Sequence, residues 1–340
     1  MVALANGAVG KAWAHHATGI MCGLLAGATF LFGAIDYATG GAAATDHNPA
    51  PVDFAIMVTG LVAAAVASKP VREWIARFIP IDPDSPVHSL SLALAVILFG
   101  TQVASIAFTD VLAAEQQSAP VSIVDFLAQE VPLLVMAVAG VGLFIRRGAA
   151  QTGQRLGFVT PTWWQMALAL AAAGAFFALS TGADSLSHWL TPDVARRVDQ
   201  ATRHSFSALT SPAGLAAIAL IPGICEDALF RGALQPRFGV ILTAVLFTSI
   251  HGEYGLSLDL PTIFVIALGL GLVRKYTNTT TSATCHAAYN LLAGFGLSGA
   301  ALYGGIAVEV ALAALVVYAV WARRRAAAVD KGAVQETRVG

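Results

Sequence analysis

Three short polar segments interrupt long apolar runs in the C-terminal half of the chain. The first pairs two adjacent acids with an arginine, the second a phenylalanine with a histidine, and the third a histidine with an asparagine. Their residues are Glu226, Asp227, Arg231, Phe247, His251, His286 and Asn290. Residues four apart share one helix face. Because ionisable groups are costly inside apolar helices and mark function by default, we interpret the set as a candidate site.

The three segments are expected to meet at one depth. Glu226 lies 13 residues before Gly239, which ends an expected turn between two antiparallel helices, and His251 lies 12 residues after it. At 1.5 Å per residue, both lie roughly 18–20 Å from that turn. His286 is 11 residues beyond Lys275, at roughly 16 Å by the same rise. The spacing therefore predicts that three titratable side chains from three helices converge near the middle of a membrane.

Such a cluster is suited to hydrolysis. A carboxylate beside an imidazole can activate a water molecule for attack on a carbonyl group. A second imidazole and an amide N–H can donate hydrogen bonds to the oxyanion that forms. Glu226, His251, His286 and Asn290 supply these four groups, and an ion pair between Asp227 and Arg231 would be structural. The residue types favour amide hydrolysis by bound water over a purely structural polar cluster.

Zinc, thiol and serine chemistry are the alternatives to a glutamate base. A zinc site with Glu226, His251 and His286 as ligands stays open, because carboxylate and imidazole both bind zinc. The thiols of Cys225 and Cys285 should point away from the site, since adjacent helical residues lie about 100° apart. A rhomboid-like serine at Ser298 is disfavoured because no histidine follows it.

Three further acids fall within apolar runs. Asp36, Glu130 and Glu309 each stand alone in the sequence, towards the ends of the expected spans. We expect them to have a partner on a neighbouring helix or a wet interface.

Composition places the chain in a membrane. Of its 340 residues, 57% are apolar and 11% are charged, with a mean hydropathy of +0.71, whereas soluble domains carry about 25% charged residues. This excludes an ordinary cytosolic enzyme and a nucleic-acid binder with a basic face. Three cysteines without paired spacing make a disulfide framework or a zinc ribbon improbable.

Apolar runs long enough to span a bilayer predict an all-α polytopic transmembrane helix bundle with about eight to ten spans. The candidate spans are 18–37, 52–68, 89–108, 126–145, 163–182, 211–234, 239–256, 259–273, 281–297 and 301–322. The first is long for a signal peptide and lacks a clear cleavage site. A short helix at the membrane interface is expected at 71–78, and a helix start at Thr191–Asp193.

The basic residues orient these spans. With the N-terminus inside, all of the 19 lysines and arginines except three fall in inner segments, as the positive-inside rule requires. The exceptions are Arg196, Arg197 and Arg203, in an outer loop at 183–210. We expect a multi-pass protein of the cell membrane with both termini in the cytoplasm.

The three motifs resemble those of the CPBP family, the CAAX-prenyl-protease-type and bacteriocin-processing glutamic intramembrane endopeptidases. The family's Glu-Glu-x-x-x-Arg appears as Glu226-Asp227-x-x-x-Arg231, its Phe-x-x-x-His as Phe247 to His251, and its His-x-x-x-Asn as His286 to Asn290. The chain departs from the family at Asp227, which is one methylene shorter than glutamate. If that acid only pairs with Arg231, aspartate suffices.

The resemblance covers roughly 155–298 and divides the chain into three regions. These are an N-terminal region of four spans at 1–154, a protease core at 155–298, and a final helix with a basic tail at 299–340. It implies that Glu226 is the water-activating base, aided by His251, that His286 and Asn290 stabilise the oxyanion, and that Arg231 holds the acidic pair.

The expected activity is therefore that of an intramembrane endopeptidase that cleaves a membrane-associated protein or peptide. The expected partners are that substrate and the lipid bilayer, without nucleic acid, and no cofactor is predicted apart from the zinc alternative. Two other classes remain: a non-proteolytic membrane scaffold, immunity or secretion-accessory protein, and a transporter that uses Glu226 as a proton-coupled carboxylate. Against the transporter, the sequence has no internal repeat of the kind found in many transporters.

Overall fold

The computed structural model describes the chain except for residues 12, 40–49, 297–298 and 337–340. Ser298 and most of the expected outer connection 38–51 lie outside the described residues. The described part contains helices and no strand, which confirms the all-α class.

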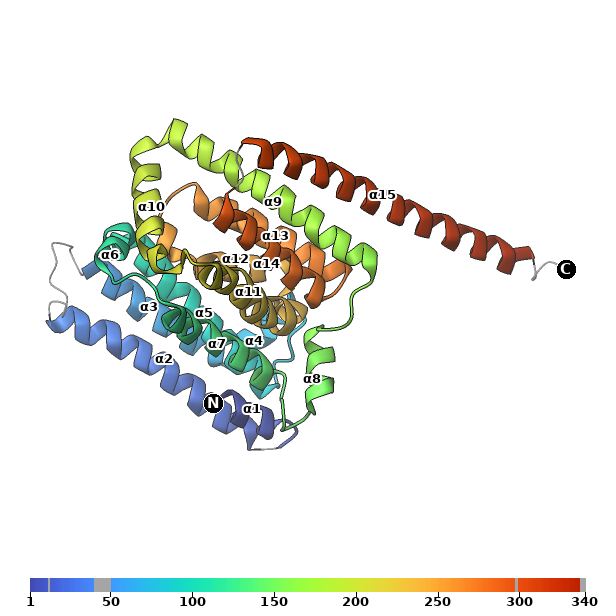
Figure 1. Cartoon of the computed structure of the whole chain (residues 1–340). Helices are drawn as coiled ribbons and strands as arrows, with labels where there is room; N and C mark the ends of the chain where they lie inside the picture. The colour runs from blue at the N-terminus through green and yellow to red at the C-terminus, as the bar shows by residue number, and fades with distance from the viewer. Residues whose placement is uncertain (12, 40–49, 297–298, 337–340) are drawn as a thin grey trace.

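The helices follow one another along the whole chain (Figure 1). In the N-terminal half they are α1 (Val2–Ala8), α2 (Ala14–Thr39), α3 (Ala50–Ala67), α4 (Lys69–Ile75), α5 (Pro86–Phe108), α6 (Val111–Gln117), α7 (Ile123–Gly140) and α8 (Ala149–Leu156). In the C-terminal half they are α9 (Trp163–Leu190), α10 (Pro192–Ser205), the 3₁₀ turn η1 (Ser207–Leu209), α11 (Pro212–Asp227), the π-helix η2 (Ala228–Leu234), α12 (Gln235–Ser249), the 3₁₀ turn η3 (Gly252–Tyr254), α13 (Asp259–Tyr276), α14 (Thr279–Phe295) and α15 (Gly299–Glu336).

The helices form a bundle with its polar centre inside. The helices α2, α3 and α5 pack together on one side, α7, α11 and α12 lie in the middle, and α9, α13 and α14 lie on the other side (Figure 1). The beginning of α15 lies against α9, while its C-terminal part projects from the bundle. The main apolar core therefore surrounds the middle helices, where Phe230, Phe247 and Ala228 are fully or almost fully buried.

Each predicted span overlaps a helix, but fewer of these helices are both long enough and apolar enough to cross a membrane. Within the described residues, six helices are long and apolar enough to cross a membrane, or seven if the bent pair of α3 and α4 is one span. The expected spans 211–234 and 239–256 join in one run, Pro212–Ser249. The expectation of eight to ten spans also counted α13 and α14. The latter has 17 residues and begins with polar Thr279–Ser282, so it is shorter and more polar at its start than the helices counted.

The sequence signals at helix ends explain most boundaries. The Ser122 hydroxyl and the Asp125 carboxylate form a capping box at the start of α7, and Asn278 accepts a hydrogen bond from the Thr281 N–H at the start of α14, which satisfies N–H groups that have no partner within a helix. Thr191 precedes α10 as expected. The expected interfacial helix corresponds to α4, which bends by 85° from α3.

The expected turn before Gly239 is present as a break inside α12. Gly239 has a φ of 76° and a ψ of 175°, in the region that only glycine adopts without steric strain. The chain thereby changes direction between Glu226 and His251, as the depth argument requires.

Close contact between α11 and α14 depends on Gly223. A Cβ atom at this position would lie 3.0 Å from both the Ala283 carbonyl oxygen and the Ala287 Cβ atom, which is closer than ordinary van der Waals contact. Small residues allow helix backbones to approach in this way in membranes.

We predict that Gly223→Val lowers the free energy of unfolding by about 1–3 kcal/mol, because the larger side chain forces α11 and α14 apart. Thermal unfolding in detergent measures this effect. Gly182→Val is the control, since a Cβ atom at Gly182 meets nothing within 4 Å. Equal stability of the two variants would contradict the packing argument.

Candidate active site

The three motifs come together from α11, η2, α12 and α14. Glu226 and Asp227 end α11, and Arg231 follows within the π-helix η2. The exposed fractions are 4% for Glu226, 0% for Asp227, 1% for Arg231 and 4% for His286. A π-helical turn is rare and is often found at functional sites. The convergence expected from the sequence is thus present for the acids, the arginine and His286.

His286 lies between the two acids. Its Nδ1 atom is 3.2 Å from Asp227 Oδ1, and its Nε2 atom is 3.7 Å from Glu226 Oε2. The first distance is that of a hydrogen bond and the second is too long for one. Glu226 Oε2 is buried without a hydrogen-bond partner among the described residues. The carboxylate is therefore close to an imidazole but not bound by it.

Arg231 is held by charge and by an aromatic ring. Its Nη1 atom is 3.6 Å from Asp227 Oδ1, and its guanidinium carbon lies 3.9 Å from the centre of the Phe247 ring, in the range of a cation–π interaction. The shorter Asp227 thus contacts both Arg231 and His286. The departure from the family motif does not separate the acid from its partners.

Phe247 lies between the two histidines. Its ring centre is 4.7 Å from that of His251 and 5.8 Å from that of His286. His251 Nδ1 is also 2.9 Å from the Phe247 carbonyl oxygen. Because a carbonyl can only accept, Nδ1 carries the proton, and in the neutral ring Nε2 is left with a free lone pair. The imidazole of His251 is thus oriented through Phe247.

Asn290 has a backbone partner that the sequence analysis did not foresee. Its Nδ2 atom donates a hydrogen bond to the Ile218 carbonyl oxygen over 3.3 Å. Four residues after Ile218 stands Pro222, inside α11. Proline has no N–H, so the Ile218 carbonyl lacks its usual helical donor and Asn290 replaces it.

Sequence reasoning missed the position of Glu130. This residue was expected to stand alone near the end of a span with a partner on a neighbouring helix or a wet interface, but it is 9% exposed on α7, and its Oε2 atom is buried without a hydrogen-bond partner among the described residues. The available signal was its spacing from Phe126 and Ala137, which places all three on one helix face. Both neighbours are buried.

Two cysteines adjoin motif residues in the sequence. Cys225 and Cys285 are buried and unpaired, and Cys285 packs in an apolar cluster with Ala169 and Leu270. Among the described residues, three side chains away from the motif residues have possible metal-ligand atoms within 4.8 Å of one another. They are Asp184, His188 and Asp199.

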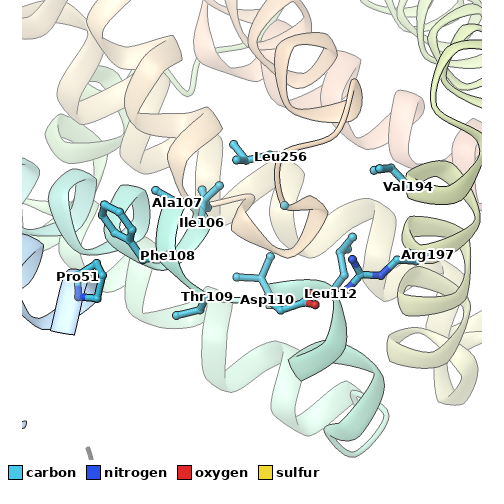
Figure 2. A pocket seen from close by; sticks show the side chains of 12 residues that line it. Pro51, Ile106, Ala107, Phe108, Thr109, Asp110, Leu112, Val194, Arg197 and Leu256 are labelled. Carbon is cyan, nitrogen blue, oxygen red and sulfur yellow. Dashed lines mark hydrogen bonds and ion pairs between the residues drawn. The ribbon is translucent and has the colours of Figure 1, made fainter. Parts of the chain in front are cut away.

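A separate cavity of about 630 Å³ lies between the end of α5, the start of α6, α10 and the segment after η3. Figure 2 shows Ile106, Phe108 and Leu256 along its wall, with the ion pair of Asp110 and Arg197 at one side. The seven motif residues do not line it.

We predict that Arg231→Met lowers the free energy of unfolding by about 3–5 kcal/mol, because it leaves the buried Asp227 carboxylate without its counter-charge. Asp227→Asn combined with Arg231→Met removes both charges and should recover part of this loss. Thermal unfolding in detergent compares the variants. If Asp227→Asn lowers the free energy of unfolding of the Arg231→Met variant by as much as it lowers that of the wild type, the two charges are not coupled.

Comparison with known proteins identifies the segment that holds the site. Neither a curated protein nor a solved structure matches the chain. Residues 208–292, which contain all seven motif residues, match the family model of the type II CAAX prenyl endopeptidase Rce1-like proteins. A match to this family supports a CAAX-type intramembrane protease in general, and the apolar helices fit a multi-pass membrane protein. The match over residues 208–292 confirms the resemblance to CAAX-type proteases that the three motifs indicate.

Proposed function

We propose that the protein is a glutamic intramembrane endopeptidase that hydrolyses a peptide bond of a membrane-associated protein or peptide. The observation that carries this proposal is the Glu226 carboxylate. It is buried, one of its oxygens has no hydrogen-bond partner among the described residues, and that oxygen lies 3.7 Å from His286 Nε2. A base of this kind can bind and deprotonate a water molecule.

The steps follow from this placement. Glu226 accepts a proton from water, and the resulting hydroxide attacks the carbonyl carbon of the substrate. The negative charge that forms on the carbonyl oxygen is stabilised by hydrogen bonds. The proton then passes to the nitrogen of the leaving group as the carbon–nitrogen bond breaks. His251 aids the base through Nε2, the nitrogen that is not bonded to the Phe247 carbonyl.

His286 and Asn290 are the proposed oxyanion donors. His286 directs Nδ1 to Asp227 and Nε2 towards Glu226. Because Nδ1–H donates to the Asp227 carboxylate, Nε2 can donate to the oxyanion only when the ring carries both protons. Asn290 uses one N–H for the Ile218 carbonyl and has a second one to give. Arg231 and Asp227 are positioning residues, since the ion pair holds the acid that orients His286.

The substrate enters from the membrane. A prenylated C-terminal Cys-a-a-X sequence is one class that fits the family, and other membrane-attached peptides fit the same chemistry. We propose a location in the cell membrane with both termini in the cytoplasm, because of the distribution of basic residues and the positive-inside rule. The region 155–298 would form the protease core and 1–154 an additional four-span region.

We predict that Glu226→Gln lowers the rate of cleavage by about 100-fold or more, as expected for the loss of a general base, while the protein stays inserted and folded. Comparative proteomics of membrane peptides, with intact protein against Glu226→Gln, measures this and identifies the substrate. Glu309→Gln, which removes an acid on α15, is the matched control. Cleavage by Glu226→Gln at the normal rate would remove the acid from the mechanism.

We propose that the reaction uses no metal, because His286 Nδ1 is bonded to Asp227 and, among the described residues, Glu226, His251 and His286 do not form a group whose ligand atoms all lie within 4.8 Å of one another. Hydrolysis should continue in the presence of a chelator, and elemental analysis of the purified protein should find no stoichiometric zinc. Loss of activity with chelator and its return with added zinc would favour the zinc alternative.

A further inference from the structure

Two aspartates meet where α2 ends and α3 begins. The two helices lie side by side and run antiparallel (Figure 1). A Cβ atom at Gly60 of α3 would lie 2.7 Å from the Phe30 amide nitrogen of α2, and one at Gly33 of α2 would lie 2.6 Å from the Asp53 carbonyl oxygen of α3. The two helix backbones are therefore in direct contact, as small residues allow in membranes.

This contact places Asp36 beside Asp53. Asp36 lies three residues after Gly33, one turn further along the same face of α2, and Asp53 is in the first turn of α3. The two carboxyl groups are hydrogen-bonded to each other. Asp36 thus has the partner on a neighbouring helix that its position in the sequence predicts.

The Asp53 side chain is enclosed. Its exposed fraction is 0%, and neither of its carboxyl oxygens receives a hydrogen bond from a donor group of the described residues. An ionised carboxylate can only accept hydrogen bonds, so a bond between two acids requires a proton on one of them. Burial of a carboxylate without a donor is costly, whereas one proton between the two groups satisfies an oxygen of each.

Helix α5, which packs on both helices of the hairpin, brings no charge to the two acids. A Cβ atom at Gly100 of α5 would contact the Thr59 side chain of α3, which places residues 100–108 opposite the beginning of α3. This stretch contains no ionisable side chain. Asp110, which follows it, is paired with Arg197.

The other helices that pack on the hairpin have their ionisable residues elsewhere. Helix α1 contains none, and α4 follows the opposite end of α3. The ionisable residues of α4 and of the first half of α2 are His15, His16, Cys22, Lys69, Arg72 and Glu73. Among the described residues, the charge that faces Asp53 is therefore that of Asp36, which has the same sign.

We propose that Asp36 and Asp53 form a proton-binding site, in which the folded chain holds one proton between the two carboxyl groups and thereby joins the end of α2 to the beginning of α3. The site is separate from the seven motif residues, and it does not depend on the proposed function. Loss of the proton leaves two negative charges in contact, which repel each other and loosen this end of the hairpin.

Infrared spectroscopy of the purified full chain in detergent at neutral pH tests the shared proton, because it detects protonated carboxyl groups. The variants are Asp36→Asn, Asp53→Asn and the double variant. Asp193→Asn is the control, since the Asp193 side chain on α10 is 87% exposed. Each single variant should remove the same carbonyl band, the double variant should remove no more than either, and the control should leave the band in place. If neither single variant removes a band, or if the double variant removes two, the proposal is wrong.

Thermal unfolding in detergent gives a second readout. An asparagine amide can donate to the remaining carboxylate as the protonated acid does, whereas alanine cannot. Asp53→Asn should therefore keep the wild-type midpoint, and Asp53→Ala should lower it by about 2–4 °C or more. A rise from about pH 6 to about pH 9 should lower the wild-type midpoint more than that of Asp53→Asn, because only the folded wild type has this proton to lose. Midpoints of the two proteins that fall in parallel would contradict the shared proton.

A metal cation between the two acids is the alternative occupant, and the buffer distinguishes it. The infrared spectrum of the wild type is compared in sodium buffer and in choline buffer, since choline is too large to enter between the helices. The same carbonyl band in both buffers supports the proton. A band that appears only when sodium is replaced by choline would show that sodium holds the acids together, and the proposal would fail.

Discussion

The ion pair of Asp227 and Arg231 is the constraint on which the centre of the molecule depends. Both side chains are essentially fully buried, and a single buried charge in such a place is strongly destabilising. The pair is kept by the π-helix, which carries Arg231, and by the Phe247 ring, which covers the guanidinium group. Asp227 in turn binds His286. One buried contact thus connects four helical elements and fixes the ring that faces Glu226.

Much of this site could be predicted from the sequence because helical geometry is regular. The four-residue spacing of the motifs places each pair on one face, and the 1.5 Å rise sets their depth. The break at Gly239 and the contact of His286 with Glu226 agree with that geometry. Composition determined the all-α class, because only helices satisfy the backbone of each segment on its own in lipid.

The rest depended on contacts between segments far apart in sequence. Glu130 belongs to no motif, and its position depends on how α7 packs on α11, which spacing along one helix does not reveal. The partner of His251 is a ring and a carbonyl of the preceding turn, not an acid. Among the described residues six or seven helices are long and apolar enough to span a membrane, because α14 is short and polar at its start and the run Pro212–Ser249 is counted once. In each case tertiary packing decides the outcome.

The proline in α11 makes the residues at positions 222 and 290 depend on each other. Since Pro222 withholds an amide proton from the Ile218 carbonyl and Asn290 supplies one instead, each residue makes the other tolerable. An ordinary residue at 222 would close the gap in the helix ladder and release the carboxamide to rotate. Evolution at one of these two sites is therefore expected to be contingent on the other, even though 68 positions separate them along the chain.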